Sequence, residues 1–373
     1  KLGTQVVMER KSEPAFQRLE EIAQSLSRAW EQGREVLVVS SGAVGLGRRQ
    51  LGLLHELELV EKQACAAVGQ ALLMEIYRTI FQRHGIKVAQ ILLTTADFSE
   101  RKRYLRLRRT LEKLLEIRVI PIINENDTVS TMELKEGVYS ESFGDNDRLS
   151  ALVAGKLGAD LLIILTDVDG IYTSDPKTNA DATRLKSIER FEQLADIRLQ
   201  GSSVSGRGGM ASKLEAARIA AISGVHTLIA SGFDPAFLST LLTCQKMAPE
   251  AACGTFIPAR AGLSGRKRWI GFASGVRGTV TINEGAVRAL VAAKASLLAV
   301  GIVRVDGAFQ PGDVVSLRNQ NDQELGRGIS NYAAVELERI AGKSSQKIAQ
   351  TLSRSGPAEI IHRDNLVIFW ESV

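Results

Sequence analysis

The sequence predicts an α/β protein, a three-layer αβα sandwich with a mainly parallel sheet, followed by a small β-rich C-terminal domain. Up to about residue 258, short apolar runs of strand length alternate with longer segments of helical period. After Gly275, short strand-like runs dominate, and we expect one helix among them, over Glu284–Lys294. We therefore predict a first domain over residues 1–258, a Gly/Arg/Lys-rich linker over 259–274 and a second domain over 275–373.

The composition is that of a soluble globular protein, because 45% of the 373 residues are apolar and 24% are charged. No apolar run approaches the roughly 18 residues that cross a bilayer, so we expect no membrane partner. The three cysteines lack metal-type spacing, and no secretory signal is visible. We therefore expect a cytoplasmic protein with reduced thiols. The chain begins at Lys1 without a Met, so we expect a few residues before it.

The formal net charge of +5 is unevenly placed along the chain. Residues 266–373 hold 14 basic and 10 acidic residues, a net charge of +4. A basic tail can bind nucleic acid, although ordinary solvated charge explains it equally well. A second basic concentration lies on the predicted helix Ser99–Glu116, and we interpret that face as mostly solvated.

Each element of the first domain follows from its own local pattern. Helices are assigned where apolar residues recur at a period near 3.6, and several of them end at a glycine such as Gly33, Gly85 or Gly158. Strands are assigned to short apolar runs, which are typical of a buried parallel sheet. In chain order we expect a helix from Pro14 to Glu31, a strand over Glu35–Ser40, a helix over Glu61–Arg83, a strand over Lys87–Leu93, a helix over Ser99–Glu116, a strand over Arg118–Ile123, a helix over Ser150–Leu157, a strand over Asp160–Leu165, a helix over Ser212–Ser223 and a strand over Val225–Ala230.

The second domain shows short runs rich in β-branched residues and a strong turn signal at Pro311-Gly312-Asp313. The expected strands are Gly278–Ile282, Ala299–Val305, Val314–Arg318, Glu324–Ser330 and Asn365–Trp370.

Polar side chains follow several of the predicted strands of the first domain, at the point where each strand ends. Because open α/β sheets bind ligands beyond the carboxyl ends of their strands, these turns are expected to converge on one site. The polar or glycine residues concerned are Lys1, Gly3 and Thr4; Ser40, Ser41 and Gly42; Asn124 and Asp127; and Thr166 and Asp167. The stretch Ser41–Gly47 is read as a glycine-rich turn.

Two further stretches suit an anionic ligand. Gly144-Asp145-Asn146-Asp147 is a tight polar turn before a helix, and Gly206–Lys213 is a glycine-rich loop that opens another helix. Backbone N–H groups in such a loop approach phosphate oxygens, and the start of a helix favours negative charge. Lys213 adds a positive charge at the same end. Taken singly, each feature could be an ordinary turn or a solvated charge.

The motifs of several common enzyme classes are absent from the sequence. There is no GxxxxGK[ST] loop, no GxGxxG loop after the first strand, no zinc-type Cys/His spacing and no hydrolase-like context around a histidine. Lysines, glycine loops and acids at strand ends instead indicate phosphoryl transfer, which needs alignment and charge stabilisation more than covalent chemistry.

The motif Thr166–Pro176, TDVDGIYTSDP, resembles the nucleotide-site motif of the amino-acid kinase family. SSGAVGLG at Ser40–Gly47, PIINEND at Pro121–Asp127 and FGDND at Phe143–Asp147 are similar to those of members that phosphorylate glutamate. The resemblance covers essentially the whole chain, and the C-terminal part resembles a PUA domain. It implies the amino-acid kinase fold over 1–258 and a PUA-like domain over 275–373. The alternatives are another amino-acid kinase and an RNA-binding protein that acts through its tail.

The resemblance also implies roles for particular residues. Lys1, Lys213 and Asp147 would be catalytic, the two lysines on the phosphates of ATP and the aspartate orienting them. The ATP-binding residues would be Lys1, Thr166, Asp167, Arg207, Gly208, Gly209, Met210, Ala211, Ser212 and Lys213. The glutamate-binding residues would be Ser41, Asp127, Asn146 and Asp145. No residue is assigned as a metal ligand, and Mg²⁺ would arrive with ATP.

The implied reaction converts L-glutamate and ATP to L-glutamyl 5-phosphate and ADP, as the first step of proline biosynthesis. The resemblance also implies inhibition by proline, assembly as a homo-oligomer and a contact between the PUA-like domain and RNA. The sequence departs from the family pattern at Arg207, where Thr is usual, at Gln5, and in extra residues around Glu136–Ser142.

Overall fold

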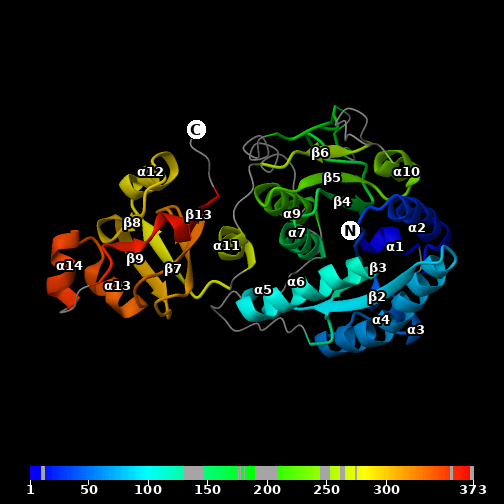
Figure 1. The fold of residues 1–373 in the computed structure, drawn as a ribbon, viewed down its shortest axis with the longest axis horizontal. Coiled ribbons are helices and arrows are strands. Elements are labelled where there is room, and N and C mark those ends of the chain that lie inside the picture. Colours follow the sequence, from blue (N-terminus) through cyan, green and yellow to red (C-terminus); the bar gives the residue numbers. More distant parts are fainter. Residues whose placement is uncertain are drawn as a thin grey trace. The chain divides into compact units, whose positions relative to one another are not determined.

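The computed structural model describes residues 1–9, 13–129, 146–174, 176, 178–179, 181–189, 209–243, 253–260, 265–273, 275–352 and 356–369. The chain divides into two compact units (Figure 1). Unit 1 consists of Lys1–Asp97 and Lys102–Gly262, and unit 2 of Phe98–Arg101 and Leu263–Val373. The short segment Phe98–Arg101 therefore groups with residues far along the chain, which the sequence did not suggest. The linker over residues 259–274 remains a prediction.

The sheet of unit 1 consists of two three-stranded halves. The first half has the order β1-β3-β2, and its neighbouring strands are parallel. The second half has the order β4-β5-β6, with β4 and β5 parallel and β6 antiparallel at the edge. The strands are β1 (Val38–Val39), β2 (Lys87–Leu93), β3 (Val119–Glu125), β4 (Leu161–Thr166), β5 (His226–Ser231) and β6 (Thr255–Ile257). The predicted, mainly parallel sheet is thus confirmed.

The first three residues join the two halves. The backbone N–H of Leu2 donates to the carbonyl of Val39 at 2.8 Å, beside β1. On the other side, the N–H of Leu165 donates to the carbonyl of Lys1 at 2.9 Å, and the N–H of Gly3 donates to the carbonyl of Leu165 at 3.0 Å. Residues 1–3 therefore form the strand-like centre of the sheet, between β1 and β4.

Helices cover both faces of this sheet, as the sequence predicted (Figure 1). On one face, α2 (Phe16–Glu31), α4 (Leu59–Gln82) and α10 (Ala236–Thr243) enclose the main apolar core, in which side chains such as Leu19 and Leu73 pack with Val38 and Ile122. On the other face, α7 (Asn146–Leu157) packs against β1, β3 and β4, and α9 (Met210–Ile222) packs against β5. The remaining described helices of unit 1 include α1 (Thr4–Val7), α3 (Ala43–Gln50) and α6 (Arg101–Glu116), while α5 (Thr95–Ser99) spans the boundary between the units.

The glycine-rich stretch after β1 is mostly a helix, and the prediction of a turn was wrong beyond Gly42. Gly42 has a φ of 106°, as a turn residue requires, but Ala43–Gln50 forms α3. A Cβ on Gly47 would lie 1.8 Å from the carbonyl oxygen of Cys65 in α4, and one on Gly69 would lie 1.8 Å from that of Ala43. These two glycines allow α3 and α4 to cross almost backbone to backbone.

Unit 2 contains the predicted β-rich sheet. Its five strands have the order β13-β11-β10-β7-β9, and a separate pair joins β8 to β12. The bounds are β7 (Gly278–Ile282), β8 (Leu297–Leu298), β9 (Ile302–Gly307), β10 (Val314–Arg318), β11 (Glu324–Ile329), β12 (Glu359–Ile361) and β13 (Leu366–Ile368).

The expectation of one helix in this unit was wrong. The predicted helix is α12 (Glu284–Ala292), whose N-terminus is capped by Asn283 through a 2.9 Å bond from the Ala286 N–H. Two more helices follow, α13 (Ala334–Ile340) and α14 (Ser345–Leu352), and the predicted linker contains α11 (Gly265–Arg268) and the π-helix Trp269–Ala273. Among all described helices, none has the length and apolar content needed to cross a membrane.

Candidate active site

Two parallel helices bring their N-termini to the same end of the sheet. α7 opens with Asn146 and Asp147, and Lys213 lies in the first turn of α9. The helices lie close together, because a Cβ on Gly155 of α7 would be 2.8 Å from the Cβ of Ser223 at the end of α9. Side chains from both N-termini can therefore meet, and both helix ends favour negative charge at this place.

Asp147 forms ion pairs with two lysines that are far apart in the sequence. Its Oδ1 atom lies 2.5 Å from Lys1 Nζ and its Oδ2 atom lies 3.3 Å from Lys213 Nζ. The three side chains are 0%, 4% and 8% exposed for Asp147, Lys1 and Lys213. Ser212 Oγ also donates to Oδ2, at 3.4 Å. Among these three described side chains, two buried ammonium groups face one carboxylate, an arrangement that suits a phosphate ligand.

A network of amides lies at the carboxyl ends of β1 and β3. Asn146 Nδ2 donates to Ser41 Oγ at 3.0 Å and to Asn124 Oδ1 at 2.9 Å. Asn124 Nδ2 in turn donates to Gln70 Oε1 at 2.9 Å, from the buried side of α4. The predicted substrate residues Ser41 and Asn146 thus come together. Sequence reasoning missed Gln70, and the signal for it was a polar residue among apolar ones in a buried helix.

Asp127 lies two residues beyond β3 and is half-buried. Burial raises the pKa of this carboxyl group above its ordinary value. Within the described part of the chain, no hydrogen bond or ion pair connects Asp127 to Ser41 or Asn146. A cationic amine beside Asp127 would compensate for the lost hydration of its carboxylate.

The predicted nucleotide residues are only partly described. Thr166 at the end of β4 is buried, and its hydroxyl donates to Asp167 Oδ1 at 2.9 Å, while Asp167 itself is exposed. Gly209 and Ala211 are exposed and Met210 is half-buried at the start of α9. The predicted residues Asp145, Arg207 and Gly208, and the extra residues Glu136–Ser142, lie outside the described residues.

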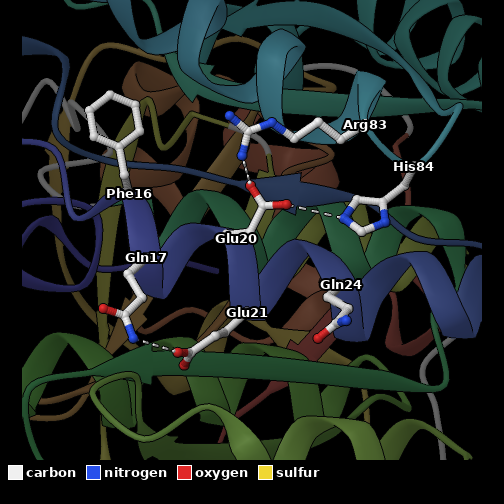
Figure 2. Close-up of a pocket in the computed structure, with 7 residues that line it drawn as sticks. All are labelled: Phe16, Gln17, Glu20, Glu21, Gln24, Arg83 and His84. Carbon is white, nitrogen blue, oxygen red and sulfur yellow. Dashed lines mark hydrogen bonds and ion pairs between the residues drawn. The ribbon is translucent and has the colours of Figure 1, made fainter.

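A surface hollow of about 430 Å³ lies elsewhere in unit 1 and contains none of the predicted site residues. It lies between α2 and the end of α4, with Phe16 and Glu20 on one side and Arg83 and His84 on the other (Figure 2). Glu20 Oε2 accepts an ion pair from Arg83 at 2.7 Å, and Oε1 lies 3.5 Å from His84 Nε2. Because Glu20 already pairs with Arg83 and Glu21 adds a second carboxylate to the lining, the hollow resembles a helix-packing groove more than an anion site.

Comparisons with known proteins identify the family of the chain. The amino acid kinase family model matches residues 1–231, and the PUA domain model matches residues 278–352. Glutamate 5-kinase of Nitrobacter hamburgensis is 46% identical over 354 residues, which cover 94% of this chain and 89% of that protein. Glutamate 5-kinases of Bradyrhizobium diazoefficiens and a Cyanothece species are 44% and 43% identical, over 93% of this chain and 90% and 92% of theirs.

The chain therefore belongs to the amino acid kinase family. It is a kinase, similar over nearly its whole length to relatives named glutamate 5-kinase, and it carries a PUA domain within the second unit.

Proposed function

We propose that this chain transfers the γ-phosphoryl group of ATP to the γ-carboxylate of L-glutamate, the first step of proline biosynthesis. The observation that carries the proposal is the buried carboxylate of Asp147 between Lys1 and Lys213. Such a cluster holds two cations in fixed positions at two helix N-termini, where phosphate oxygens bind well. Similarity to glutamate 5-kinases supplies the identity of the acceptor.

The chemistry needs no general base. A γ-carboxylate with an ordinary pKa of about 4.3 is already ionised at neutral pH. One of its oxygens forms a bond to the γ-phosphorus, and the bond from that phosphorus to the bridging oxygen breaks, so ADP leaves with the electron pair. The obstacle is repulsion between carboxylate and triphosphate, and two fixed ammonium groups reduce it where the charge develops.

Each part of the site then has a role. Lys1 and Lys213 contact the phosphates, and Asp147 is a positioning residue that holds both lysines. Ser41, Asp127 and Asn146 bind glutamate, with the Asp127 carboxylate on the α-amine. Thr166, Asp167 and the start of α9 bind the nucleotide. Proline also presents a carboxylate beside a cationic amine, so we propose that it competes at Asp127.

A divalent metal fits this site as a companion of the nucleotide. The described residues contain no group of three His, Cys, Asp or Glu side chains placed to hold a metal, and Asp147 is already occupied by two lysines. Mg²⁺ commonly binds through phosphates and water with few protein ligands. Bound there, it would supply further charge neutralisation. Assembly as a homo-oligomer and a cytoplasmic location stay predictions.

The test is an acceptor panel. Purified protein with ATP and Mg²⁺ is assayed for ADP release with glutamate, aspartate, N-acetylglutamate or UMP. We expect turnover with glutamate and at least a tenfold lower kcat/KM with each of the other acceptors. A tenfold difference in kcat/KM corresponds to about 1.4 kcal/mol of transition-state stabilisation. Preference for another acceptor would replace the proposed substrate while retaining the kinase assignment. No release with any acceptor would reject both.

A further inference from the structure

Helix α6 carries a concentration of positive charge that the kinase reaction does not use. Residues 101–116 contain seven Lys or Arg and two Asp or Glu, a net charge of +5. This equals the formal net charge of all 373 residues, so the rest of the chain is neutral in sum. A charge this local creates a positive surface that attracts polyanions.

Three of the basic residues of α6 lie in a row on one exposed face of the helix. Leu111 and Leu115 are 0% and 6% exposed and fix the face that packs inward. Lys102, Arg106 and Arg109 are exposed and recur at i, i+4 and i+7, the spacing of one helix face. With a rise of 1.5 Å per residue, this row is about 10 Å long. We call these three residues the α6 stripe.

The stripe differs from two other cations of the same helix, which each pair with a glutamate. Arg108 pairs with Glu112 at 2.6 Å, and Lys113 pairs with Glu116 at 2.7 Å. No residue in the described part of the chain forms an ion pair with the side chains of the stripe. Like charges at i, i+4 destabilise a helix by a few tenths of a kcal/mol, so an external anion would relieve them.

We propose that the α6 stripe binds the phosphate backbone of RNA. Leu105 is the one large apolar side chain of α6 that is substantially exposed among its described positions, at 44%, so the helix has little to insert into a bilayer. The stripe itself contains only lysine and arginine, and Tyr104 of the same helix is half-buried with Lys156 over its ring, so the stripe suits backbone phosphates rather than bases. The chain also carries a PUA domain, a module that suggests RNA binding. The kinase unit would thereby add a contact of its own, which depends on charge and not on RNA sequence.

The test uses the full chain and matched double variants. Arg106→Gln with Arg109→Gln removes two stripe charges, and Arg108→Gln with Arg78→Gln removes two charges that lie off the stripe and pair with Glu112 and Glu75. Binding of a fluorescein-labelled single-stranded RNA is measured by anisotropy across a series of KCl concentrations. Each phosphate contact contributes about 0.7 to the slope of log K against log salt, so the stripe variant should lose about 1.4 from the parent slope. The control should keep the parent slope, and both should keep the parent Tm.

Four outcomes would overturn the proposal. The first is a parent protein that does not bind RNA at low salt. The second is a stripe variant with the parent slope, which would place the RNA on other residues. The third is an equal loss in both variants, which would reduce the effect to net charge. Stronger binding of the parent to phosphatidylserine vesicles than to RNA, lost in the stripe variant, would identify a membrane surface as the partner instead.

Discussion

Lys1 and Asp147 form a buried ion pair in which the ammonium nitrogen lies 2.5 Å from a carboxylate oxygen. The pair joins the central strand of the sheet to the first turn of α7. Removing one partner of a buried pair usually costs about 3–5 kcal/mol, because the remaining charge is left without compensation. Lys213 contacts the second oxygen of Asp147, so Asp147 keeps a charged partner when either lysine is lost. The cost of losing one lysine is therefore smaller than for an isolated pair.

Lys213→Ala should therefore fold normally and lose catalysis. We expect kcat to fall by about 10²- to 10³-fold, as for the loss of one preorganised charge donor. Lys87→Ala, the same change at an exposed lysine of β2, is the control and should keep the parent kcat. Steady-state kinetics and circular dichroism make the measurement, and a folded Lys213→Ala protein with the parent kcat would remove Lys213 from the mechanism.

Asp127→Asn should weaken glutamate and proline together. Losing a charge-assisted hydrogen bond of about 1.5–3 kcal/mol raises the glutamate KM roughly 10- to 150-fold, with the ATP KM nearly unchanged. Because burial raises the pKa of Asp127, the parent should lose glutamate affinity on acidification at a pH above the ordinary aspartate value of 3.8. The variant should keep only the acid limb that comes from protonation of the substrate's own γ-carboxylate, whose ordinary pKa is about 4.3. If only proline inhibition weakened, the two ligands would not share Asp127.

Gln70→Leu should raise the glutamate KM through Asn146 rather than by direct contact. Gln70 Oε1 accepts from Asn124 Nδ2, which turns Asn124 Oδ1 toward Asn146. Without Gln70 the buried amide of Asn124 loses its acceptor, at a cost of about 1–3 kcal/mol. We expect a tenfold or greater rise in glutamate KM with little change in ATP KM. Gln82→Leu, at the exposed end of α4, is the control. A lowered Tm with the parent KM would show that Gln70 is only structural.

Gly69→Ala should destabilise unit 1 strongly. Its new methyl group would lie 1.8 Å from the Ala43 carbonyl oxygen, so α3 and α4 must separate. Overpacking of this kind costs about 1–3 kcal/mol or more. Gly285→Ala in α12 is the matched control, because the nearest atom to its Cβ is Asn283 Oδ1 at 3.3 Å. Urea denaturation compares the two, and equal stability of Gly69→Ala and its parent would refute the close crossing.

Lys156→Met should change how stability depends on pH. Burial, reinforced by Arg108, lowers the pKa of Lys156 from 10.5 to about 6, and its nitrogen lies over the ring of Tyr104. Between those values the unfolded chain binds one more proton than the folded chain, so the parent gains stability as pH rises. The gain is at most about 1.4 kcal/mol per pH unit.

The Lys156→Met variant lacks this increase in stability with pH. The difference in free energy of unfolding between the variant and the parent should therefore be largest near pH 6 and decrease toward pH 9. Urea denaturation at both pH values, comparing the parent with the variant, isolates Lys156 from other titrating groups. Parallel pH profiles for the two proteins would mean that Lys156 stays charged in the folded state.

The sequence allowed prediction of the layered fold and of most of the residues that meet at the candidate site. Ser41 and Thr166 could be found because parallel strands end at a common edge, and Asn146 and Asp147 because a tight polar turn precedes a helix. Lys213 could be found because glycine loops before helices attract anions.

The features that escaped prediction have physical explanations. Gly47 reads equally well as a turn residue or a helix-packing residue, and only its contact with Cys65 distinguishes the two. α13 and α14, with seven and eight residues, contain too few turns for a helical period to emerge. Lys156 near the end of a helix reads as solvated, and its burial depends on neighbours distant in the sequence. Gln70 acquires its role only through Asn124.

The central strand of the sheet has a consequence for the order of folding. The backbone nitrogen of Lys1 donates to the carbonyl of Ile163, 162 residues further along the chain. Contacts with such long sequence separation form slowly, because a large loop must close first. During synthesis, residues 1–3 leave the ribosome long before β4 exists. Lys1 can therefore reach Asp147 only once the two half-sheets have joined, and catalytic competence should be among the last properties acquired by a newly made chain.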